Sequence, residues 1–254
     1  MAGNNQFSVT ESDPLLELIY SKATGQVVVV AGQAVNFWAK RYSEDEPALS
    51  EFYPFTSSDL DLLGHIADAY RLAQEPHTKI ERPRKSVASP VVANVQVSIG
   101  NVTRSVQFLR HVGGVTNTEI TKYAVPFIRK DVTLYFSDPI TMLKAKLHNL
   151  VGLPQEDRND VRHVEILRLC VPVFVNGLLL AADETDRAAK QSLENIQRVL
   201  KLSESPIARR IPVGNRFDWK ALIPIKRLNK VRNQRFKNFR KGQFERWFGA
   251  IKAG

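Results

Sequence analysis

The stretch Val27–Tyr42, VVVVAGQAVNFWAKRY, joins a run of valines to an amphipathic segment through a glycine. β-Branched residues favour a strand, and the apolar residues that follow recur at helical spacing. The pattern predicts a strand over Gln26–Val30, a turn at Gly32 and a helix over Ala34–Tyr42. A glycine turn at a helix N-terminus is an anion site, because free N–H groups and the helix dipole favour phosphate.

A second stretch, Phe55–Gly64 or FTSSDLDLLG, sets Asp59 and Asp61 one residue apart in another apolar run. We expect a strand over Asp59–Leu63, in which alternation points both carboxylates to one face. Two close carboxylates repel each other unless a cation bridges them, and Mg²⁺ prefers one or two carboxylates plus substrate phosphates. The spacing therefore predicts a metal site at Asp59 and Asp61; the alternative is a solvated strand edge.

The rest of the chain changes from strands to helices. Two apolar runs around Gly100 and Asn101 predict a hairpin, and a second strand pair is expected around Ile128–Phe136. After that, Ser137 or Asp138 is placed to cap a helix, and two further helical segments follow. We expect an α+β fold in three parts: a mixed sheet with flanking helices over 1–136, a helical domain over 137–205 and a basic helical tail over 206–254.

The basic charge is concentrated in this tail. Residues 206–254 hold 14 Lys and Arg against two acidic residues, whereas residues 1–205 hold 22 basic and 24 acidic residues. Such a segment attracts polyanions, so RNA, DNA or an acidic protein is the expected partner, and a solvated basic face is the alternative. With Leu228, Val231, Phe236 and Phe239 packed on the body, the side chains expected to face outward are Lys226, Arg227, Lys230, Arg232, Arg235, Lys237, Arg240 and Lys241.

Composition and targeting signals favour a soluble protein. The N-terminus lacks the basic and apolar regions of a signal peptide, and no apolar stretch is expected to span a membrane. The single cysteine, Cys170, lies in an apolar run and is expected in the core. We therefore predict a cytoplasmic location without a membrane partner.

Together, VVVVAGQAV and TSSDLDLLG resemble the minimal nucleotidyltransferase superfamily, the polymerase-beta-like fold. Within it the chain looks like the AbiEii-type branch, known from toxins of type IV toxin–antitoxin and phage-defence systems. That branch has a downstream lysine-bearing helix and an acidic motif. Here DPITMLKAKLHNL supplies Lys144 and Lys146, and RNDVRHVEILRL supplies Arg158 and Asp160.

The resemblance implies Mg²⁺-dependent transfer of a nucleoside monophosphate from an NTP to an RNA, such as a tRNA, or to a protein. It also implies a two-metal site and an antitoxin-like partner. Asp59 and Asp61 would bind the metals, Asp160 would belong to the acidic motif, and one lysine would neutralise phosphate charge. Lys144 and Lys146 lie two apart on a helix and cannot both face the site; Lys144 is preferred. The residues implied to approach the triphosphate are Gly32, Gln33, Ser57 and Ser58.

Three departures from the superfamily pattern bear on catalysis. Gln33 stands where relatives have a smaller residue, so its backbone or amide must take that role, and the segment between Gly32 and Asp59 is long. The neighbouring strand carries Gln107 where a third carboxylate is expected, and a glutamine is neutral. Either the third acid is Asp131 or Asp160, or the site binds a nucleotide without efficient transfer.

His163 falls three residues after Asp160, where a second acid is expected. At this helical spacing the two side chains can meet, and the pair would orient a base, contact a phosphate or form a surface ion pair. Three hypotheses remain for the chain: an active nucleotidyltransferase, a degenerate member of that fold that binds nucleic acid or a partner, and a basic structural protein without a site.

Overall fold

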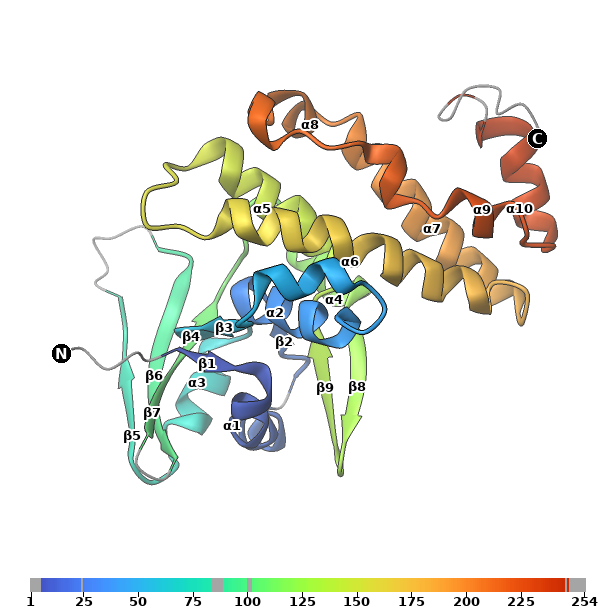
Figure 1. Cartoon of the computed structure of the whole chain (residues 1–254). Helices are drawn as coiled ribbons and strands as arrows, with labels where there is room; N and C mark the ends of the chain where they lie inside the picture. The colour runs from blue at the N-terminus through green and yellow to red at the C-terminus, as the bar shows by residue number, and fades with distance from the viewer. Residues whose placement is uncertain (1–5, 24, 84–88, 100–101, 245, 247–254) are drawn as a thin grey trace.

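The computed structural model describes residues 6–23, 25–83, 89–99, 102–244 and 246 (Figure 1). Its α-helices are α1 Val9–Lys22, α2 Ala31–Tyr42, α3 Ile66–Leu72, α4 Asn117–Tyr123, α5 Pro139–Gly152, α6 Asp160–Ala181, α7 Asp186–Ser203, α8 Pro206–Arg210, α9 Ile225–Leu228 and α10 Gln234–Phe239. The strands are β1 Phe7–Ser8, β2 Val28–Val29, β3 Thr56–Ser57, β4 Asp59–Leu63, β5 Thr78–Glu81, β6 Val91–Ile99, β7 Val102–Leu109, β8 Val125–Arg129 and β9 Val132–Phe136. Short 3₁₀ turns are η1 Pro47–Phe52, η2 Val213–Asn215 and η3 Trp219–Leu222, and a π-helical turn, η4, covers Arg240–Phe244.

Among the described residues, seven strands form one sheet in the order β5-β6-β7-β4-β2-β9-β8. The β4–β7 and β2–β9 pairs are parallel and the other neighbours are antiparallel, which confirms the expected mixed sheet. β1 and β3 pair separately as a two-stranded ribbon. The fold is therefore α+β, and β4 lies inside the sheet between β7 and β2.

Helices cover this sheet from two sides. In Figure 1, α5 and α6 cross above the strands, while α1 and α3 lie below them. The underside is apolar: Leu60, Leu62, Val95 and Val106 alternate along β4, β6 and β7 and are all buried. Because alternate residues point to opposite faces, the polar residues between them lie on the other side of the same strands.

The strand, turn and helix of the opening stretch are present, with shifted boundaries. β2 is shorter than the expected strand, and α2 starts at Ala31 rather than at Ala34. Ala31 has a φ of 53°, a left-handed conformation that is uncommon for residues other than glycine. The chain thus turns at Ala31, and Gly32 already belongs to the first turn of the helix.

Local signals predicted several other elements. The strand expected over Asp59–Leu63 is β4, and the two expected hairpins are β6–β7 and β8–β9; Gly100 and Asn101 themselves lie outside the described residues. Asp138 is the N-cap of α5, accepting hydrogen bonds from the backbone N–H groups of Ile140 and Thr141. The short helix α4 was not predicted from the sequence.

Helix α6 corrects one expectation, because it is long and apolar enough to cross a membrane by length and composition. Because the helix begins with polar residues, its apolar stretch was predicted to be too short to span a membrane. In the structure α6 packs against α2, α5 and α7, and its buried side includes Ile166, Leu167 and Val171. These contacts favour the core helix of a soluble protein, and a cytoplasmic location stays a prediction.

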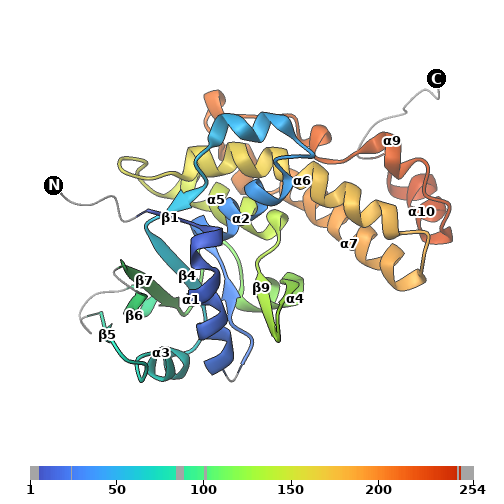
Figure 2. The same ribbon diagram turned by 60° about the horizontal axis from the view of Figure 1, so that its bottom comes forward.

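The predicted segment boundaries fall between elements, after β9 and after α7. Buried side chains from all three segments, from Phe7 to Phe239, nevertheless join one hydrophobic cluster. Figure 2 shows α6 and α7 running side by side, with α9 and α10 near one end of the pair. The segments therefore share a core, and their status as separate domains stays a prediction.

The tail packs on the body through the apolar side chains expected to do so. Leu228, Val231, Phe236 and Phe239 are all buried. They belong to two short helices and the break between them, rather than to one helix. In the sequence, the spacing of Phe244, Trp247, Phe248 and Ile251 also predicts a second apolar helix, which lies largely outside the described residues.

Candidate functional site

Asp59 and Asp61 lie on the upper face of β4, with Leu60 buried between them on the other face. Both carboxylate side chains are partly exposed. Ser58 donates its hydroxyl hydrogen to Asp59 Oδ2 over 2.8 Å. The alternation predicted from the sequence thus places two acidic groups on one face of the strand. The Ser58 hydroxyl is hydrogen-bonded to the Asp59 carboxylate.

The pair is electrostatically strained. Burial and the negative charge of Asp59 raise the pKa of Asp61 from 3.8 to about 6, and the positive charge of Lys146 only partly opposes them. A divalent cation between the carboxylates would relieve this repulsion and restore an ordinary pKa. Asp59 and Asp61 are therefore the residues of this site that could hold a metal.

Gln107 lies directly beside Asp61 on the parallel neighbour β7, at the place expected for a third carboxylate. Asp131, one of the two alternatives, is an exposed residue of the β8–β9 turn at the other edge of the sheet. Among the described residues, no group of three or more His, Cys, Asp and Glu side chains is arranged to hold a metal ion. The side chain beside the two carboxylates on β7 is thus the amide of Gln107 rather than a third acid.

Further amides and hydroxyls continue this polar face away from β4. The register aligns Asp59 with Ser105 on β7, and Ser105 with Gln96 on β6. Ser105 donates its hydroxyl hydrogen to Asn94 Oδ1 over 3.0 Å. The face next to the carboxylates is therefore built from uncharged polar groups, which suit hydrogen bonding to an acceptor molecule.

Lys146 of α5 forms a buried ion pair with Asp160 at the start of α6. Its Nζ lies 3.0 Å from Asp160 Oδ1, and the two residues are 8% and 1% exposed. Asp160 Oδ2 also accepts a hydrogen bond from Arg158 Nε over 2.6 Å. Burial would raise the pKa of Asp160, but Lys146 and Arg158 outweigh it and hold that pKa below its ordinary value. Asp160 thus fixes Lys146 in place and is already occupied by two cations.

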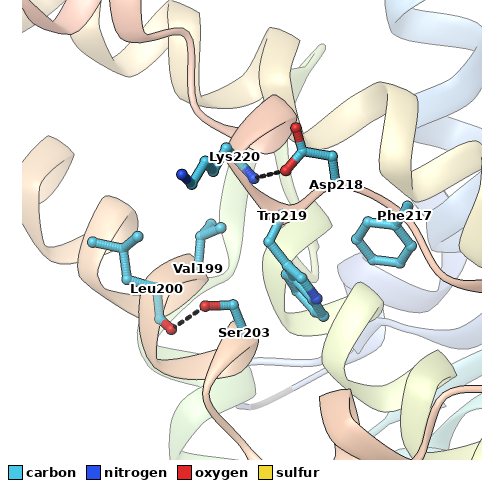
Figure 3. Close-up of a pocket in the computed structure, with 7 residues that line it drawn as sticks. All are labelled: Val199, Leu200, Ser203, Phe217, Asp218, Trp219 and Lys220. Carbon is cyan, nitrogen blue, oxygen red and sulfur yellow. Dashed lines mark hydrogen bonds between the residues drawn. The ribbon is translucent and has the colours of Figure 1, made fainter. Parts of the chain in front are cut away.

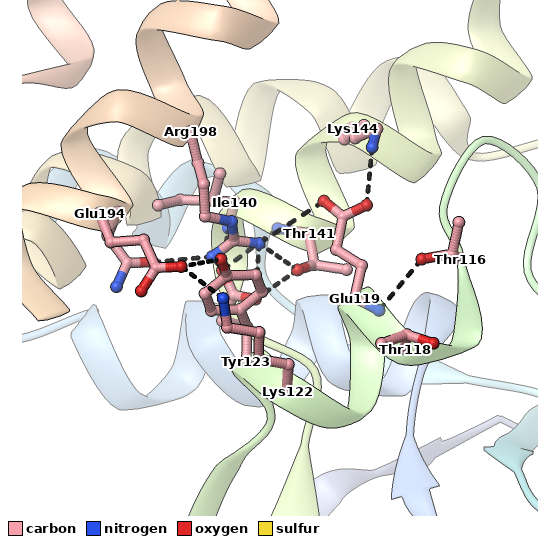
Figure 4. A network of polar contacts seen from close by, with 12 residues as sticks. Thr116, Thr118, Glu119, Lys122, Tyr123, Ile140, Thr141, Lys144, Glu194 and Arg198 are labelled. Carbon is pink, nitrogen blue, oxygen red and sulfur yellow. Dashed lines mark hydrogen bonds and ion pairs between the residues drawn. The ribbon is translucent and has the colours of Figure 1, made fainter.

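Lys144 takes a different partner from the one the sequence suggested. Its Nζ binds Glu119 Oε2 of α4 over 2.7 Å (Figure 4). The lysine charge that acts on Asp61 is that of Lys146. The contacts therefore favour Lys146 over the predicted Lys144, and the sequence could not identify this side of α5 because the helix is buried on several sides.

Glu119 and Lys144 belong to a set of mutually paired polar groups, which we call the Lys144 cluster (Figure 4). Arg198 of α7 binds both carboxylate oxygens of Asp138, at 3.1 and 3.2 Å, and stacks on the Tyr123 ring with its guanidinium carbon 3.6 Å from the centroid. The cluster joins α4, α5 and α7; its members are Glu119, Tyr123, Asp138, Thr141, Lys144, Glu194 and Arg198.

Gly32 lies where β2 turns into α2, and Val30 N–H donates to the Asp61 carbonyl over 2.9 Å. A methyl group added at Gly32 would approach Ser57 Oγ to 3.1 Å and His163 Cε1 to 3.5 Å. Gly32 is buried, and its missing side chain lets the start of α2 pack closely against a hydroxyl and an imidazole. This contact adjoins the strand that bears the carboxylates, and a helix N-terminus beside a metal site would suit an anion.

Gln33 is placed differently from the expectation. Its side chain is 1% exposed, and Nε2 donates to the Phe7 carbonyl over 3.2 Å. Oε1 has no hydrogen-bond partner among the described residues. The side-chain amide is therefore used to hold β1 rather than to approach a phosphate.

His163 lines the turn from the α6 side. It is 7% exposed, and its Nδ1 has no partner among the described residues. Burial, with the positive charges of Lys146 and Arg162, lowers the pKa of His163 to about 3. The imidazole is thus neutral near pH 7, and the expected pairing with Asp160 is replaced by the bonds of Asp160 to Lys146 and Arg158. We name the Lys146 cluster by its members: Gly32, Asp59, Asp61, Lys146, Asp160 and His163.

Of the eight cations expected to face outward from the tail, Arg235 is exposed and forms a surface ion pair, whereas Arg240 is partly buried. Arg235 binds both carboxylate oxygens of Asp186, at 2.7 and 2.8 Å. Arg240 donates to the carbonyls of Leu228 and Val231. The side chains of Lys226, Lys230, Arg232, Lys237 and Lys241 are exposed, and Arg227 is partly exposed.

Comparison of the chain with profiles of known protein families, and with curated protein sequences, found no match. The function must therefore be argued from the geometry of the Lys146 cluster.

Proposed function

We propose that this protein is a Mg²⁺-dependent nucleotidyltransferase that transfers a nucleoside monophosphate from an NTP to an RNA acceptor. The observation that carries the proposal is the position of Asp59 and Asp61 on β4, hydrogen-bonded through the Asp61 carbonyl to the turn that opens α2. A metal-binding pair next to a phosphate-binding turn is the arrangement that this reaction needs.

The donor set fits Mg²⁺. Two carboxylates plus phosphate oxygens are the ligands this ion prefers, and the raised pKa of Asp61 reflects a repulsion that the ion would remove. When bound, Mg²⁺ would polarise the phosphates and offset the negative charge that develops during transfer. Asp59 and Asp61 would hold it, and the amide oxygen of Gln107 offers a neutral donor beside them.

The protein's own groups would orient the NTP. The start of α2, the Ser57 hydroxyl and the neutral His163 ring lie close together at Gly32, and these groups would contact a phosphate of the NTP. Lys146 adds positive charge next to Asp61. In the transfer, an acceptor hydroxyl oxygen bonds to the α-phosphorus, the bond from this phosphorus to the bridging oxygen breaks, and pyrophosphate leaves while the hydroxyl proton passes to water.

The acceptor is assigned to RNA on the basis of charge. The exposed cations of the tail attract a phosphate backbone through counterion release. The polar face of β6 and β7 next to Asp59 offers amides and hydroxyls, the groups that hydrogen-bond to bases and to ribose.

Labelling with each α-³²P-labelled NTP, Mg²⁺ and total RNA tests the proposal. We expect the parent protein to label RNA and the Asp59→Asn/Asp61→Asn variant to lose at least about 100-fold of that activity, because the cation loses both charged ligands. Asp131→Asn is the matched control, since Asp131 is exposed at the far edge of the sheet. Equal labelling by the double variant would contradict the assignment of the site.

A second function is favoured by Gln107. A glutamine beside Asp61 cannot act as a base or as a charged ligand, which would suit a protein that binds a nucleotide or a nucleic acid without transfer. The same experiment distinguishes the two. Mg²⁺-dependent NTP binding by the parent protein without label transfer would favour the binding function.

A further inference from the structure

A hollow lies between α7 and the segment Phe217–Lys220, outside the Lys146 cluster. It has a volume of about 300 Å³ and lies next to η3. Val199, Leu200 and Ser203 of α7 form one wall, and Phe217, Trp219 and Lys220 form the other (Figure 3). The walls are thus mainly aliphatic and aromatic, with polar groups at the rim.

The two rings form a pair that stays partly open to solvent. Phe217 and Trp219 have their centroids 4.7 Å apart and are tilted by 45°. Both rings pack on the core from one side, yet both remain partly exposed. An aromatic face that is held in place and only partly covered can stack with a further flat ring.

Charged residues alternate with these rings along the sequence RFDWK, Arg216–Lys220. Arg216, Asp218 and Lys220 are exposed, whereas the two rings between them point inward. Asp218 accepts a hydrogen bond from the backbone N–H of Lys220 over 2.9 Å, which holds the turn (Figure 3). The segment therefore presents rings to the hollow and charges to its surroundings.

The segment that bears the two rings carries a net positive charge. Residues 206–220 contain Arg209, Arg210, Arg216 and Lys220 against one acid, Asp218. Arg209 and Arg216 donate to the main-chain carbonyls of Glu204 and Ile211 rather than to carboxylates. No ion pair of these four cations occurs within the described part of the chain.

We propose that this hollow binds an unstacked base of single-stranded nucleic acid, with Trp219 and Phe217 as the stacking surface and Arg216 and Lys220 as contacts to the flanking phosphates. Aromatic rings set among cations suit such a strand, because every base has a stacking face and every link carries a negative charge. An aliphatic peptide would use the walls but not the cations, and a free phosphate would use the cations but not the walls. This binding does not depend on whether the Lys146 cluster transfers nucleotides.

Fluorescence anisotropy with the full chain tests the site. The probes are a fluorescein-labelled 12-mer of uridylate, an abasic strand of the same length and a 12-base-pair duplex. The parent protein should bind the uridylate strand about 10-fold more tightly than the abasic strand and the duplex, and Trp219→Ala should remove this preference, as expected for loss of base stacking. Equal binding of all three probes by the parent protein would overturn the proposal.

Two more variants separate stacking from loss of structure. Trp219→Phe keeps a ring and should retain most of the preference for bases, while thermal melting checks that each variant folds. Arg216→Ala/Lys220→Ala should weaken binding of the uridylate and abasic strands alike and reduce the dependence of affinity on salt. A preference that survives Trp219→Ala in a folded protein would place the base elsewhere.

Discussion

The two polar clusters on either side of α5 differ in which charges lie next to one another. In the Lys144 cluster opposite charges meet: Lys144 binds Glu119, and Arg198 binds Asp138. In the Lys146 cluster Asp61 lies beside another acid, Asp59. Each cluster also holds one buried nitrogen without a partner among the described residues, Arg198 Nε in the first and His163 Nδ1 in the second. Contacts between opposite charges are typical of a structural cluster, whereas repulsion between two carboxylates is typical of a cation site.

The comparison also shows why two lysines that lie two residues apart on one helix can have different roles. Residues two apart on a helix point in opposite directions, so Lys144 and Lys146 face different elements. Lys144 meets α4 at a partly exposed position, and Lys146 meets the start of α6 in the interior. The same residue type therefore serves a surface contact on one side and a candidate active site on the other.

The largest expected effect on stability comes from replacing Lys146, and replacing Lys144 gives the comparison. Lys146→Met should lower the free energy of unfolding by about 3 kcal/mol, because it leaves the buried Asp160 carboxylate without its closest cation. Lys144→Met should cost less than about 1 kcal/mol, because the Lys144–Glu119 pair is partly exposed. Urea denaturation at neutral pH measures both values. Equal losses in the two variants would show that the clusters do not differ as described.

An intermediate effect concerns Asp61 and pH. Its pKa of about 6 in the folded protein exceeds the ordinary 3.8, so the unfolded chain ionises first as the pH rises. The free energy of unfolding should therefore fall by about 1–3 kcal/mol between pH 4 and pH 7 because of this group. Asp61→Asn removes that contribution, and the variant should gain stability relative to the parent over the same pH range.

Because other carboxylates titrate in the same range, the quantity to plot is the difference between the parent and Asp61→Asn at each pH. Asp160, for instance, has a lowered pKa and stabilises the fold as the pH rises, but it contributes equally to both proteins. Adding Mg²⁺ should raise the melting temperature of the parent only. A difference that does not change with pH would mean that the Asp61 carboxyl is not perturbed.

The smallest expected effect on stability comes from Gly32→Ala in the first turn of α2. Gly32→Ala should change the free energy of unfolding by less than about 1 kcal/mol, because alanine favours a helix while its methyl group crowds Ser57 Oγ at 3.1 Å. NTP binding should weaken at least about 3-fold, since the methyl group would push Ser57 and His163 away from the helix N-terminus where the phosphates are proposed to bind. Equilibrium titration with NTP and Mg²⁺ measures this change.

Ser57→Ala in the Gly32→Ala background provides the control. Removing the Ser57 hydroxyl relieves the closest contact of the new methyl group, so part of the lost stability should return. If NTP affinity in Gly32→Ala equals that of the parent, the phosphates do not lie at this turn.

Local patterns in the sequence predicted the parts of the site that depend on one strand or one turn. Alternation placed Asp59 and Asp61 on one face. A cap at Ser137 or Asp138 followed from the residues before Pro139, and Asp138 is the cap. These features were predictable because alternation and capping are set by residues within a few positions of one another. The neighbouring position of the Gln107 strand came instead from the family resemblance.

Only the tertiary structure decided which partner each buried polar group takes. Lys144 binds Glu119 from another helix, Gln33 is held by the Phe7 carbonyl, and Asp160 is shared by Lys146 and Arg158. The hollow at Trp219 depends likewise on the tail folding back onto α7. Such contacts join residues far apart in the chain, so the strands, caps and charges of this protein follow from its sequence, whereas the pairing of its buried charges follows from packing.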